Sequence, residues 1–418
     1  LSNVSYTTIT KNELKGIDLK TIPNQLKYSL DNSIARDKRN ANLIVSPIIK
    51  ENGVYKKITA FTVNYNANAR SIPSNTFRRE TTNSVLNAGQ WHRFYVDTTG
   101  VFKITKSFLN SLGVNTSGTD PRNIKLFGNG GNMIPYANSE LYPLDLTENA
   151  IRLVGESDGQ FDNSDYILFY AQGPRGYNAE SNTNINIYTD KTYYYINISP
   201  GQGKRVQPFI QPSGPIDLEI NQFQDYQFHE VDEYNLANVG RRWFGDRFDI
   251  ENSKSFEFEF PDIVASEPAS FKVIVASDAE SPTSMQVNVN GSAVTTLNLI
   301  GASDPNLATE SFFDGNINLS SANVSVDLNF DNGGNPSANG YLDYISIEAT
   351  RSLNFSGDQF TFRNDVTATS TGIGRYTVSN TSEVSEIWDI TYLYNVTTVV
   401  NTEASTSLSF TATLGTLR

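Results

Sequence analysis

The stretch FEFEF at residues 256–260 and the stretch VSVDLNF at residues 324–330 alternate strictly between apolar and polar side chains. Strict alternation places one set of side chains on a core face and the other set in solvent. This period of two is typical of antiparallel strands that are buried on one side only. The two stretches therefore predict a chain that is mainly β, with several β-rich domains and very little helix.

Turn signals surround these strands. Asn290-Gly291 tolerates the positive φ angles of a type I′ turn, so residues 285–299 are predicted to form a hairpin. Asn332-Gly333 closes another strand before the apolar segment Tyr341–Ile347. Short strands separated by turns at intervals of about ten residues indicate a β-sandwich of the jelly-roll type over residues 216–350.

The length of 418 residues predicts about three domains. Changes in composition divide the chain into an N-terminal β-rich segment with a linker (1–83), a mixed β domain with one short helix (84–215), the sandwich (216–350) and a further β segment (351–418). The linker is assigned to Ser71–Asn83, which is polar, contains a proline and lacks periodicity.

The elements outside the sandwich follow from local signals. Thr105 is predicted to cap the N-terminus of the helix, Phe108, Leu109 and Leu112 give it an apolar face, and Gly113 ends it. Five apolar or aromatic-rich segments are predicted as strands, namely Val54–Tyr65, Ile124–Phe127, Tyr166–Tyr170, Tyr193–Ile198 and Ile387–Tyr394.

The charge balance excludes several classes of protein. Lys and Arg number 32 against 45 Asp and Glu, a net charge of −13, which argues against a nucleic-acid partner. No apolar run approaches 18 residues, so no membrane span is predicted.

The chain begins at Leu1 without a leader and therefore looks trimmed. Its low content of charged residues and abundant Asn and Thr suit an exported bacterial surface protein.

The candidates for catalysis are few. Cysteine is absent, which excludes disulfides, thiolate metal sites and a cysteine nucleophile within these residues. The two histidines, His92 and His229, belong to no HExxH motif, and no GxSxG occurs. The glycine-rich segment 128–131 lacks the Gly-Lys-Ser/Thr of a phosphate loop and is predicted to be a tight turn. We therefore predict no catalytic residue.

The acidic run from Glu156 to Asp165 is the one candidate metal site. In the register of an EF-type calcium loop, Glu156, Asp158, Asp162 and Asp165 fall at positions three, five, nine and twelve. Position one is Val154, which cannot ligate. Calcium at this loop is the only cofactor that the sequence suggests. The alternative is an acidic turn whose aspartates cap the strand that follows.

Aromatic side chains supply the candidate binding residues. Trp243 and Phe244, together with Tyr341 and Tyr344, could form a platform for a sugar ring. The alternative is that these aromatics belong to the core of the sandwich, which is the commoner role of an aromatic stripe on a strand.

Six phrases in a fixed order give the chain a resemblance to a known family. They are TTGVFKITKSFLNSLGV (98–114), IKLFGNGGNMIP (124–135), ESDGQFDNSDYILFYAQGP (156–174), TDKTYYY (189–195), FHEVDEYNLANVGRRWFGDRF (228–248) and GYLDYISIEATRSL (340–353). Their ordered combination resembles the N-terminal, non-catalytic region of the sortase of the bacterial type IX secretion system, a gingipain-like cysteine peptidase. The resemblance covers nearly the whole chain from about residue 50.

The resemblance implies a cell-surface enzyme, attached to the outer membrane through partners, that removes C-terminal sorting signals from secreted cargo. The implied partners are an outer-membrane β-barrel carrier, cargo with C-terminal sorting domains, and the chain's own C-terminal peptidase domain. The family's catalytic dyad is a His in a His-Gly pair and a Cys in a Gly-Cys pair. Here His92 precedes Arg93 and His229 precedes Glu230, so no catalytic residue is carried over, and the peptidase domain is expected beyond Arg418.

One phrase departs from the family pattern. Residues 240–243 read Gly-Arg-Arg-Trp where a Gly-Arg-Glu-Trp-like phrase is expected, and we interpret the change as the reversal of a surface charge. Two other functions stay open at this point. One is a surface carbohydrate-binding or adhesin module built on the jelly roll, and the other is an inhibitory prodomain that acts on a related peptidase.

Overall fold

The structure is a computed structural model that describes residues 1–418 except 16, 18, 36–37, 65–82, 138–139 and 239. It divides into two compact units, Leu1–Phe77 and Arg78–Arg418, which are described separately. The predicted linker lies outside the described residues apart from Asn83. No helix in the described part of the chain is long and apolar enough to cross a membrane.

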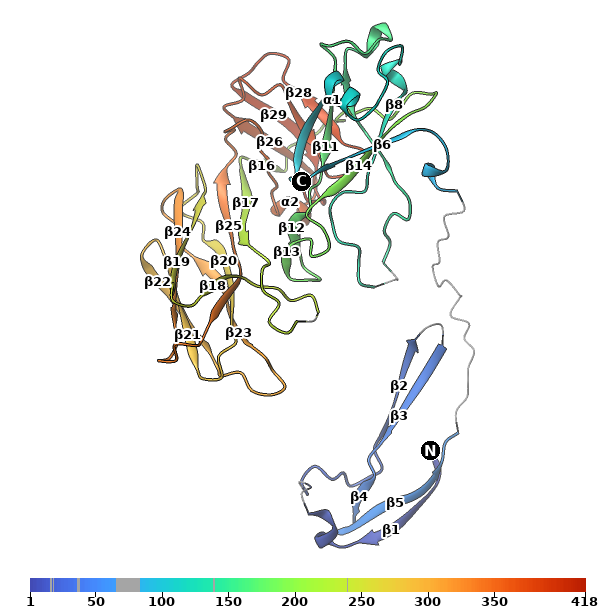
Figure 1. Cartoon of the computed structure of the whole chain (residues 1–418), viewed down its shortest axis with the longest axis vertical. Coiled ribbons are helices and arrows are strands. Elements are labelled where there is room, and N and C mark those ends of the chain that lie inside the picture. The colour runs from blue at the N-terminus through green and yellow to red at the C-terminus, as the bar shows by residue number, and fades with distance from the viewer. Residues whose placement is uncertain (16, 18, 36–37, 65–82, 138–139, 239) are drawn as a thin grey trace. The chain divides into compact units, whose positions relative to one another are not determined.

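The first unit consists of two small antiparallel sheets (Figure 1, blue). One has the order β1-β5-β4, and the other is the hairpin β2–β3. The strand predicted from Val54 ends at Thr62, and Tyr65 lies outside the described residues. The elements of this unit are β1 (Ser2–Ile9), η1 (Lys11–Leu14), β2 (Tyr28–Ala35), β3 (Lys38–Val45), β4 (Ile48–Glu51) and β5 (Val54–Thr62).

The second unit begins with the mixed β domain, in which two sheets enclose a buried cluster that includes Phe169 and Tyr194. The sheets have the orders β10-β11-β7 and β6-β14-β8-β9, and a short hairpin, β12–β13, projects from them. The strands are β6 (Trp91–Val96), β7 (Gly100–Thr105), β8 (Ile124–Phe127), β9 (Glu148–Asn149), β10 (Arg152–Val154), β11 (Tyr166–Ala171), β12 (Arg175–Asn178), β13 (Thr183–Ile185) and β14 (Thr192–Ile198).

The helix prediction is confirmed for α1 (Lys106–Ser111). The Thr105 hydroxyl accepts a hydrogen bond from the Phe108 backbone N–H at 3.3 Å, as an N-cap residue does. Leu109 is fully buried, and Gly113 adopts a φ of +84°, which ends the helix. The other helical elements of the domain are single 3₁₀ turns, η2 (Val85–Asn87), η3 (Pro121–Asn123) and η4 (Glu156–Asp158).

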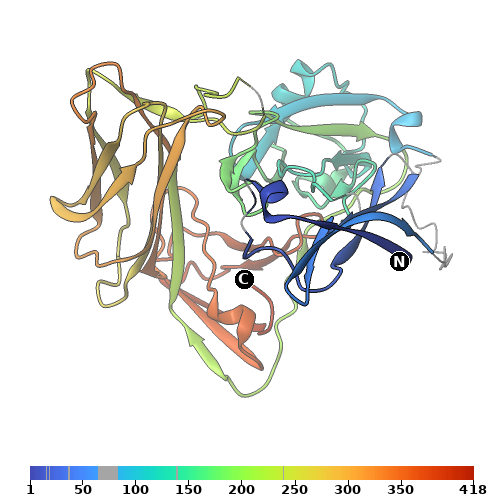
Figure 2. The same ribbon diagram turned by 90° about the horizontal axis from the view of Figure 1, so that it is seen from below.

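The predicted sandwich is confirmed, and its strand order is that of a jelly roll. One sheet has the order β17-β25-β20-β23, with β18 also paired to β25, and the other has the order β19-β24-β21-β22. Both sheets are visible side by side in Figure 2. The strands are β17 (Gln222–Glu230), β18 (Gly245–Phe248), β19 (Ser253–Glu259), β20 (Ala269–Ser277), β21 (Thr283–Val289), β22 (Ser292–Leu299), β23 (Thr309–Ile317), β24 (Asn323–Asp331) and β25 (Gly340–Ser352).

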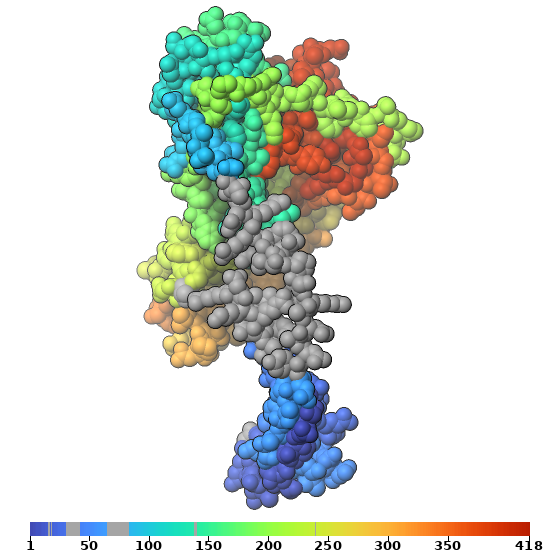
Figure 3. All heavy atoms as spheres, turned by 90° about the vertical axis from the view of Figure 1, so that its right-hand side faces the viewer, coloured from blue at the N-terminus to red at the C-terminus, as the bar shows by residue number. Residues whose placement is uncertain are grey.

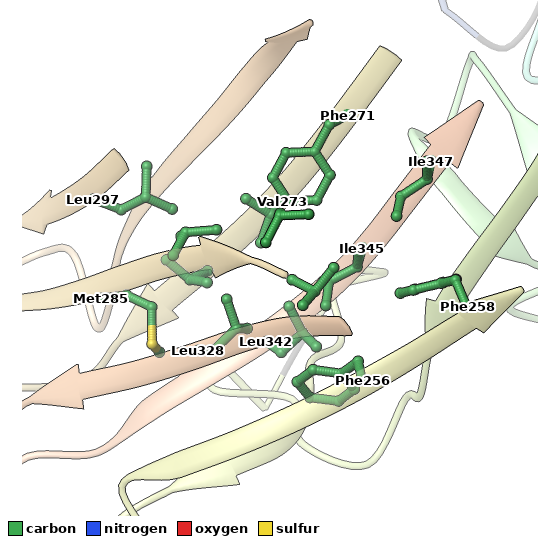
Figure 4. Packing of buried hydrophobic residues seen from close by; sticks show 14 of the residues in the cluster. Phe256, Phe258, Phe271, Val273, Met285, Leu297, Leu328, Leu342, Ile345 and Ile347 are labelled. Atoms are coloured by element: carbon green, nitrogen blue, oxygen red, sulfur yellow. The ribbon is translucent and has the colours of Figure 1, made fainter. Parts of the chain in front are cut away.

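The alternation that predicts the sandwich also positions its core. Phe256 and Phe258 point inward from β19 and meet Phe271 and Ile347 of the facing sheet (Figure 4). The hairpin turn predicted at Asn290-Gly291 is confirmed, because both residues have positive φ angles, 48° and 73°.

The C-terminal segment forms two further sheets, β15-β28-β27 and β16-β26-β29, each of which includes one short strand from residues 207–220. The predicted strand from Ile387 to Tyr394 is wrong beyond Asp389, because the Asp389 carboxylate accepts the backbone N–H of Thr391 at 3.0 Å and turns the chain. The elements are β15 (Gln207–Pro208), β16 (Leu218–Ile220), α2 (Val366–Thr369), β26 (Ile373–Ser379), β27 (Glu386–Asp389), β28 (Thr397–Val400) and β29 (Ser407–Thr413).

These C-terminal sheets contact the mixed β domain (Figure 3, red against cyan and green). The Ala150 backbone N–H donates to the Tyr394 carbonyl at 3.2 Å, and Arg152 forms an ion pair with Glu386. The Val101 backbone N–H donates to the Gln359 side chain at 2.9 Å.

Candidate functional site

A cavity of about 290 Å³ opens where the hairpin β12–β13 meets the outer face of the jelly roll. We call it the acid–arginine pocket, because carboxylates and two arginines dominate its lining. The lining residues are Tyr136, Glu180, Ser181, Thr183, Ile187, Glu230, Asp232, Arg241, Arg242, Trp243 and Asp343.

The floor of the pocket is a set of hydrogen bonds between the two domains. Glu230, at the end of β17, accepts bonds from the Thr183 hydroxyl, from the Asn184 backbone N–H at 2.6 Å and from the Asn184 side chain at 3.0 Å. All three residues are buried. Nearby, Tyr344 donates its hydroxyl to Asn182 at 2.9 Å. The hairpin tip is therefore fixed against the sheet, as Figure 1 shows for β13 beside β17.

A β-bulge places Asp343 in the pocket. On β25, Tyr344 pairs with Ile274 but Leu342 pairs with Val275, so Asp343 between them has no partner on β20. A bulge of this kind re-aims a side chain beside a site. The Asp343 side chain lines the pocket although it is only 3% exposed.

Asp343 is incompletely satisfied. Its Oδ2 atom lies 2.9 Å from Nη2 of Arg242, yet no described residue forms a hydrogen bond with this buried oxygen. Arg242 forms a second ion pair, with Glu310 of β23. One guanidinium thus serves two carboxylates, and Asp232 lies close enough to Arg242 to interact with it electrostatically.

Burial raises the pKa of three of these groups. Desolvation, together with the neighbouring carboxylates Glu230, Glu310 and Asp232, raises the pKa of Asp343 to about 8 in spite of Arg242. Burial also raises the pKa of Glu230, although the bonds from Thr183 and Asn184 oppose the shift. The pKa of Asp232 is raised by burial as well. Perturbed carboxylates in a cavity are typical of a binding site.

Replacing Glu230 with glutamine is expected to destabilise the second unit by about 1–2 kcal/mol, because the new amide presents a donor to groups that are themselves donors. The measurement is the midpoint of urea unfolding of the purified chain. Glu257→Gln, on the exposed face of β19, serves as the control and should shift the free energy of unfolding by less than about 0.5 kcal/mol. An unchanged midpoint in Glu230→Gln would contradict the expectation.

Of the four aromatic candidates, Tyr341 and Tyr344 are buried, and the adjacent Trp243 and Phe244 differ in position. Trp243 is 38% exposed and lines the pocket, so it is accessible to a ligand. Phe244 is 6% exposed and packs against Ala276 and Tyr341 in a small buried cluster, which is the alternative expected for such aromatics. The interpretation of Arg242 as a reversed surface charge stays a prediction; its side chain is 38% exposed and forms ion pairs with Glu310 and Asp343.

Three of the four calcium candidates, Glu156, Asp158 and Asp165, have other partners for their carboxylates. Glu156 pairs with Arg205 at 2.9 Å, and Asp158 accepts the Gln160 backbone N–H at 3.0 Å. Asp165, which is 8% exposed, accepts the Asp162 backbone N–H at 2.7 Å and closes the turn before β11. Within the described ranges, no three His, Cys, Asp or Glu side chains are grouped so that they could hold a metal ion.

Calcium binding at this loop stays a prediction, and thermal unfolding tests it. A calcium site should raise the melting temperature in millimolar calcium, because binding to the folded state alone stabilises it. Asp162→Asn should abolish that increase. If the melting temperature is the same in calcium and in chelator, the acidic run is a turn and nothing more.

The remaining sequence features have structural roles. The Nδ1 atom of His92 lies 2.9 Å from the Leu112 carbonyl, and Nε2 of His229 lies 2.5 Å from Asp246. The glycine-rich turn packs closely against the protein, because a Cβ atom on Gly131 would lie 2.2 Å from the Gly173 carbonyl oxygen.

A second cavity of about 310 Å³ lies among the aromatic side chains of the C-terminal sheets, at their contact with β7 and β11.

Sequence reasoning missed Glu230, Asp232 and Asp343. A signal was present for one of them, because Asp343 is the single charged residue in the apolar run Tyr341–Ile347 of a strand that is buried on both faces. A charge at such a position is found only where it has a partner or a ligand. Glu230 and Asp232 carry no comparable local signal.

Among solved structures, the chain matches dimeric latent PorU from Porphyromonas gingivalis with a TM-score of 0.64 and 19% sequence identity. The match covers 79% of this chain and 31% of the PorU chain. The CBM36-1 domain of a xylanase from the hindgut metagenome of Trinervitermes trinervoides matches 34% of this chain and 100% of that domain, with 16% identity and a TM-score of 0.21. A TM-score this low carries no argument about fold or ligand.

No protein-family model matches the chain, and no curated protein matches its sequence. The chain spans about a third of the length of the PorU chain, so the two share the fold of a part and not of the whole. The resemblance to the type IX sortase family is thereby confirmed at the level of the fold: this chain has the β-rich architecture of part of PorU.

Proposed function

We propose that this chain is the non-catalytic scaffold and docking region of a gingipain-like cysteine endopeptidase, the sortase of a type IX secretion system. The observation that carries the proposal is the match to PorU over 79% of the chain. The six ordered phrases of the sequence support it independently, because they span both the mixed β domain and the jelly roll.

On this proposal the catalytic step belongs to another part of the full protein. A thiolate attacks the scissile carbonyl, an acyl-enzyme forms, and water or an amine resolves it. These 418 residues contain no cysteine, so they cannot supply the thiolate. Their β domains would hold the peptidase domain at the cell surface, contact an outer-membrane β-barrel carrier, and limit the access of cargo with C-terminal sorting domains.

The coding sequence tests the assignment directly. We expect the reading frame of the full protein to continue beyond Arg418 into a domain with one His-Gly pair and one Gly-Cys pair. A continuation without these pairs, or a stop codon directly after Arg418, would exclude the sortase assignment.

The purified 418-residue chain is expected to show no peptidase activity, because it has no cysteine to act as the nucleophile. The assay is cleavage of a fluorogenic peptide that spans the junction of a cargo protein and its sorting domain, with and without a thiol reductant. The full-length protein serves as the positive control. Cleavage by the 418-residue chain that a thiol reagent blocks would contradict the proposal.

Docking has a separate test. The chain, immobilised on a resin, should retain the β-barrel carrier from a detergent extract of outer membranes of the source bacterium. The first unit and the second unit, immobilised separately, show which of them is responsible. If neither unit retains an outer-membrane protein, the docking role that we propose is contradicted.

A second candidate function is a surface carbohydrate-binding module, and the exposed Trp243 at the acid–arginine pocket favours it. An indole face beside carboxylates can stack on a sugar ring while the carboxylates accept hydrogen bonds from the hydroxyl groups of the sugar. Binding on a glycan array that Trp243→Ala abolishes, with an unchanged melting temperature, would support this function. Absence of glycan binding would remove it.

A further inference from the structure

The acid–arginine pocket has a surplus of hydrogen-bond acceptors. The Asp343 Oδ2 atom is buried and receives no hydrogen bond from the described residues. The half-buried Asp232 carboxylate likewise receives no hydrogen bond from the part of the chain that the structure describes. A buried acceptor without a hydrogen bond is destabilising, so a ligand that donates a hydrogen bond to it is favoured. A ligand of this pocket should therefore supply hydrogen-bond donors.

The pocket also has more carboxyl groups than guanidinium groups. The carboxyl side chains that line it are those of Glu180, Glu230, Asp232 and Asp343, against the two guanidinium groups of Arg241 and Arg242, and Arg242 is also paired with Glu310. Arg241 lies over an aromatic ring of the lining, with its guanidinium 3.8 Å from the centre of the Tyr136 ring. A cationic donor suits the pocket better than a neutral one, because a cation beside Asp343 favours the ionised form of this carboxyl group.

The mouth of the pocket defines the shape of the donor. Trp243 and Tyr136 are each 38% exposed, so the opening is lined by aromatic surface, while the buried carboxyl groups of Glu230 and Asp343 lie deeper. An apolar stem with a charged tip matches this order, because the stem contacts the rings and the tip reaches the carboxylates. An ammonium group provides three N–H donors on a compact cation, and the lysine side chain has such a stem.

We propose that the acid–arginine pocket binds the lysine side chain of an extended peptide, with the ammonium group between Asp343 and Asp232 and the side-chain methylenes against Trp243. The inference rests only on the residues of the pocket and does not depend on the proposed sortase function.

Isothermal titration calorimetry on the whole 418-residue chain tests the proposal with three probes, acetyl-Ala-Lys-Ala-amide, the same peptide with norleucine in place of lysine, and n-butylamine. The lysine peptide is expected to bind with a Kd of about 0.1–1 mM, in the range of a single side-chain contact. The norleucine peptide should bind at least about tenfold more weakly, because it keeps the stem and lacks the donor. Equal affinity of the two peptides, or binding of neither, would overturn the proposal.

Variants localise the binding. Asp343→Asn and Asp232→Asn should each weaken the lysine peptide about tenfold, whereas Glu257→Gln, a carboxylate on the far sheet, should leave its affinity unchanged within about twofold. Melting temperatures confirm that each variant is folded. Asp232 is only half-buried, so Asp232→Asn still tests the proposal if Asp343→Asn does not fold. Unchanged affinity in both aspartate variants would place the peptide elsewhere and overturn the proposal.

Two further arms separate the lysine peptide from other ligands. If n-butylamine binds as tightly as the lysine peptide, the site recognises a free amine and the peptide part of the proposal is overturned. If maltotriose binds, and competes with the lysine peptide, the pocket is a sugar site and the proposal fails. Weaker binding of n-butylamine together with no competition by maltotriose would support a peptide ligand.

Discussion

Replacing Arg351 with methionine is expected to destabilise the second unit by about 3–5 kcal/mol, the cost of removing one member of a buried ion pair. Arg351 lies at the end of β25, is 6% exposed, and donates to the Asp225 carboxylate at 2.7 Å and to the Pro261 carbonyl at 2.6 Å. Its guanidinium also lies 5.1 Å from the Phe223 ring and 5.9 Å from the Phe360 ring.

The expected loss is large because Arg351 joins three parts of the fold. Phe360 belongs to the C-terminal cluster, Asp225 to β17, and Pro261 to the turn after β19. The measurement is the free energy of unfolding from urea titration. A matched control is Arg375→Met, because Arg375 pairs with Glu219 at the surface, with exposures of 46% and 62%. The control should lose less than about 1 kcal/mol. Equal losses in the two variants would contradict this account.

Replacing Asp343 with asparagine is expected to stabilise the chain, and the gain should grow with pH. The pKa of Asp343 is raised to about 8 in the folded state, mainly by burial. The folded chain therefore binds this proton more tightly than the unfolded chain, in which an aspartate has a pKa of about 3.9. The contribution of Asp343 to stability is fully present below about pH 4 and is lost as pH rises through about 8.

Asparagine does not titrate, so the variant avoids this loss. The difference in unfolding free energy between Asp343→Asn and the original chain should be small at pH 4 and on the order of 2–5 kcal/mol above pH 8. Urea titrations at pH 4, 6 and 8.5 measure it. Asp97→Asn, at an exposed position in the mixed β domain, should show no such trend. A difference that is constant from pH 4 to pH 8.5 would show that Asp343 is charged throughout.

Much of the fold could be predicted because it depends on local patterns. The alternation from Phe256 to Phe260 needs only a period of two, and the turn at Asn290-Gly291 needs only two residues that tolerate positive φ. The cap at Thr105 depends on a bond to a residue three positions away. Each signal lies within a few residues of the feature that it predicts.

The acid–arginine pocket could not be predicted in the same way. Glu230 meets Thr183 and Asn184, which are more than forty positions away, and Asp343 meets Arg242, which is about a hundred away. The bulge that turns Asp343 toward the pocket depends on its pairing with β20, which no periodicity records. Trp243 could be named as a candidate from its residue type. That Trp243 is exposed while the neighbouring Phe244 is buried depends on tertiary packing.

The parallel pairing of β16 with β26 has a consequence for the order in which the chain assembles. Residues 218–220 bind residues 374–376, and the Leu353 backbone N–H donates to the Asn221 carbonyl at 2.8 Å, so the polypeptide enters and leaves the jelly roll at a single point. The jelly roll is thus an insertion within a smaller host domain. During synthesis from the N-terminus, β16 therefore stays unpaired until the whole jelly roll and then β26 have been made.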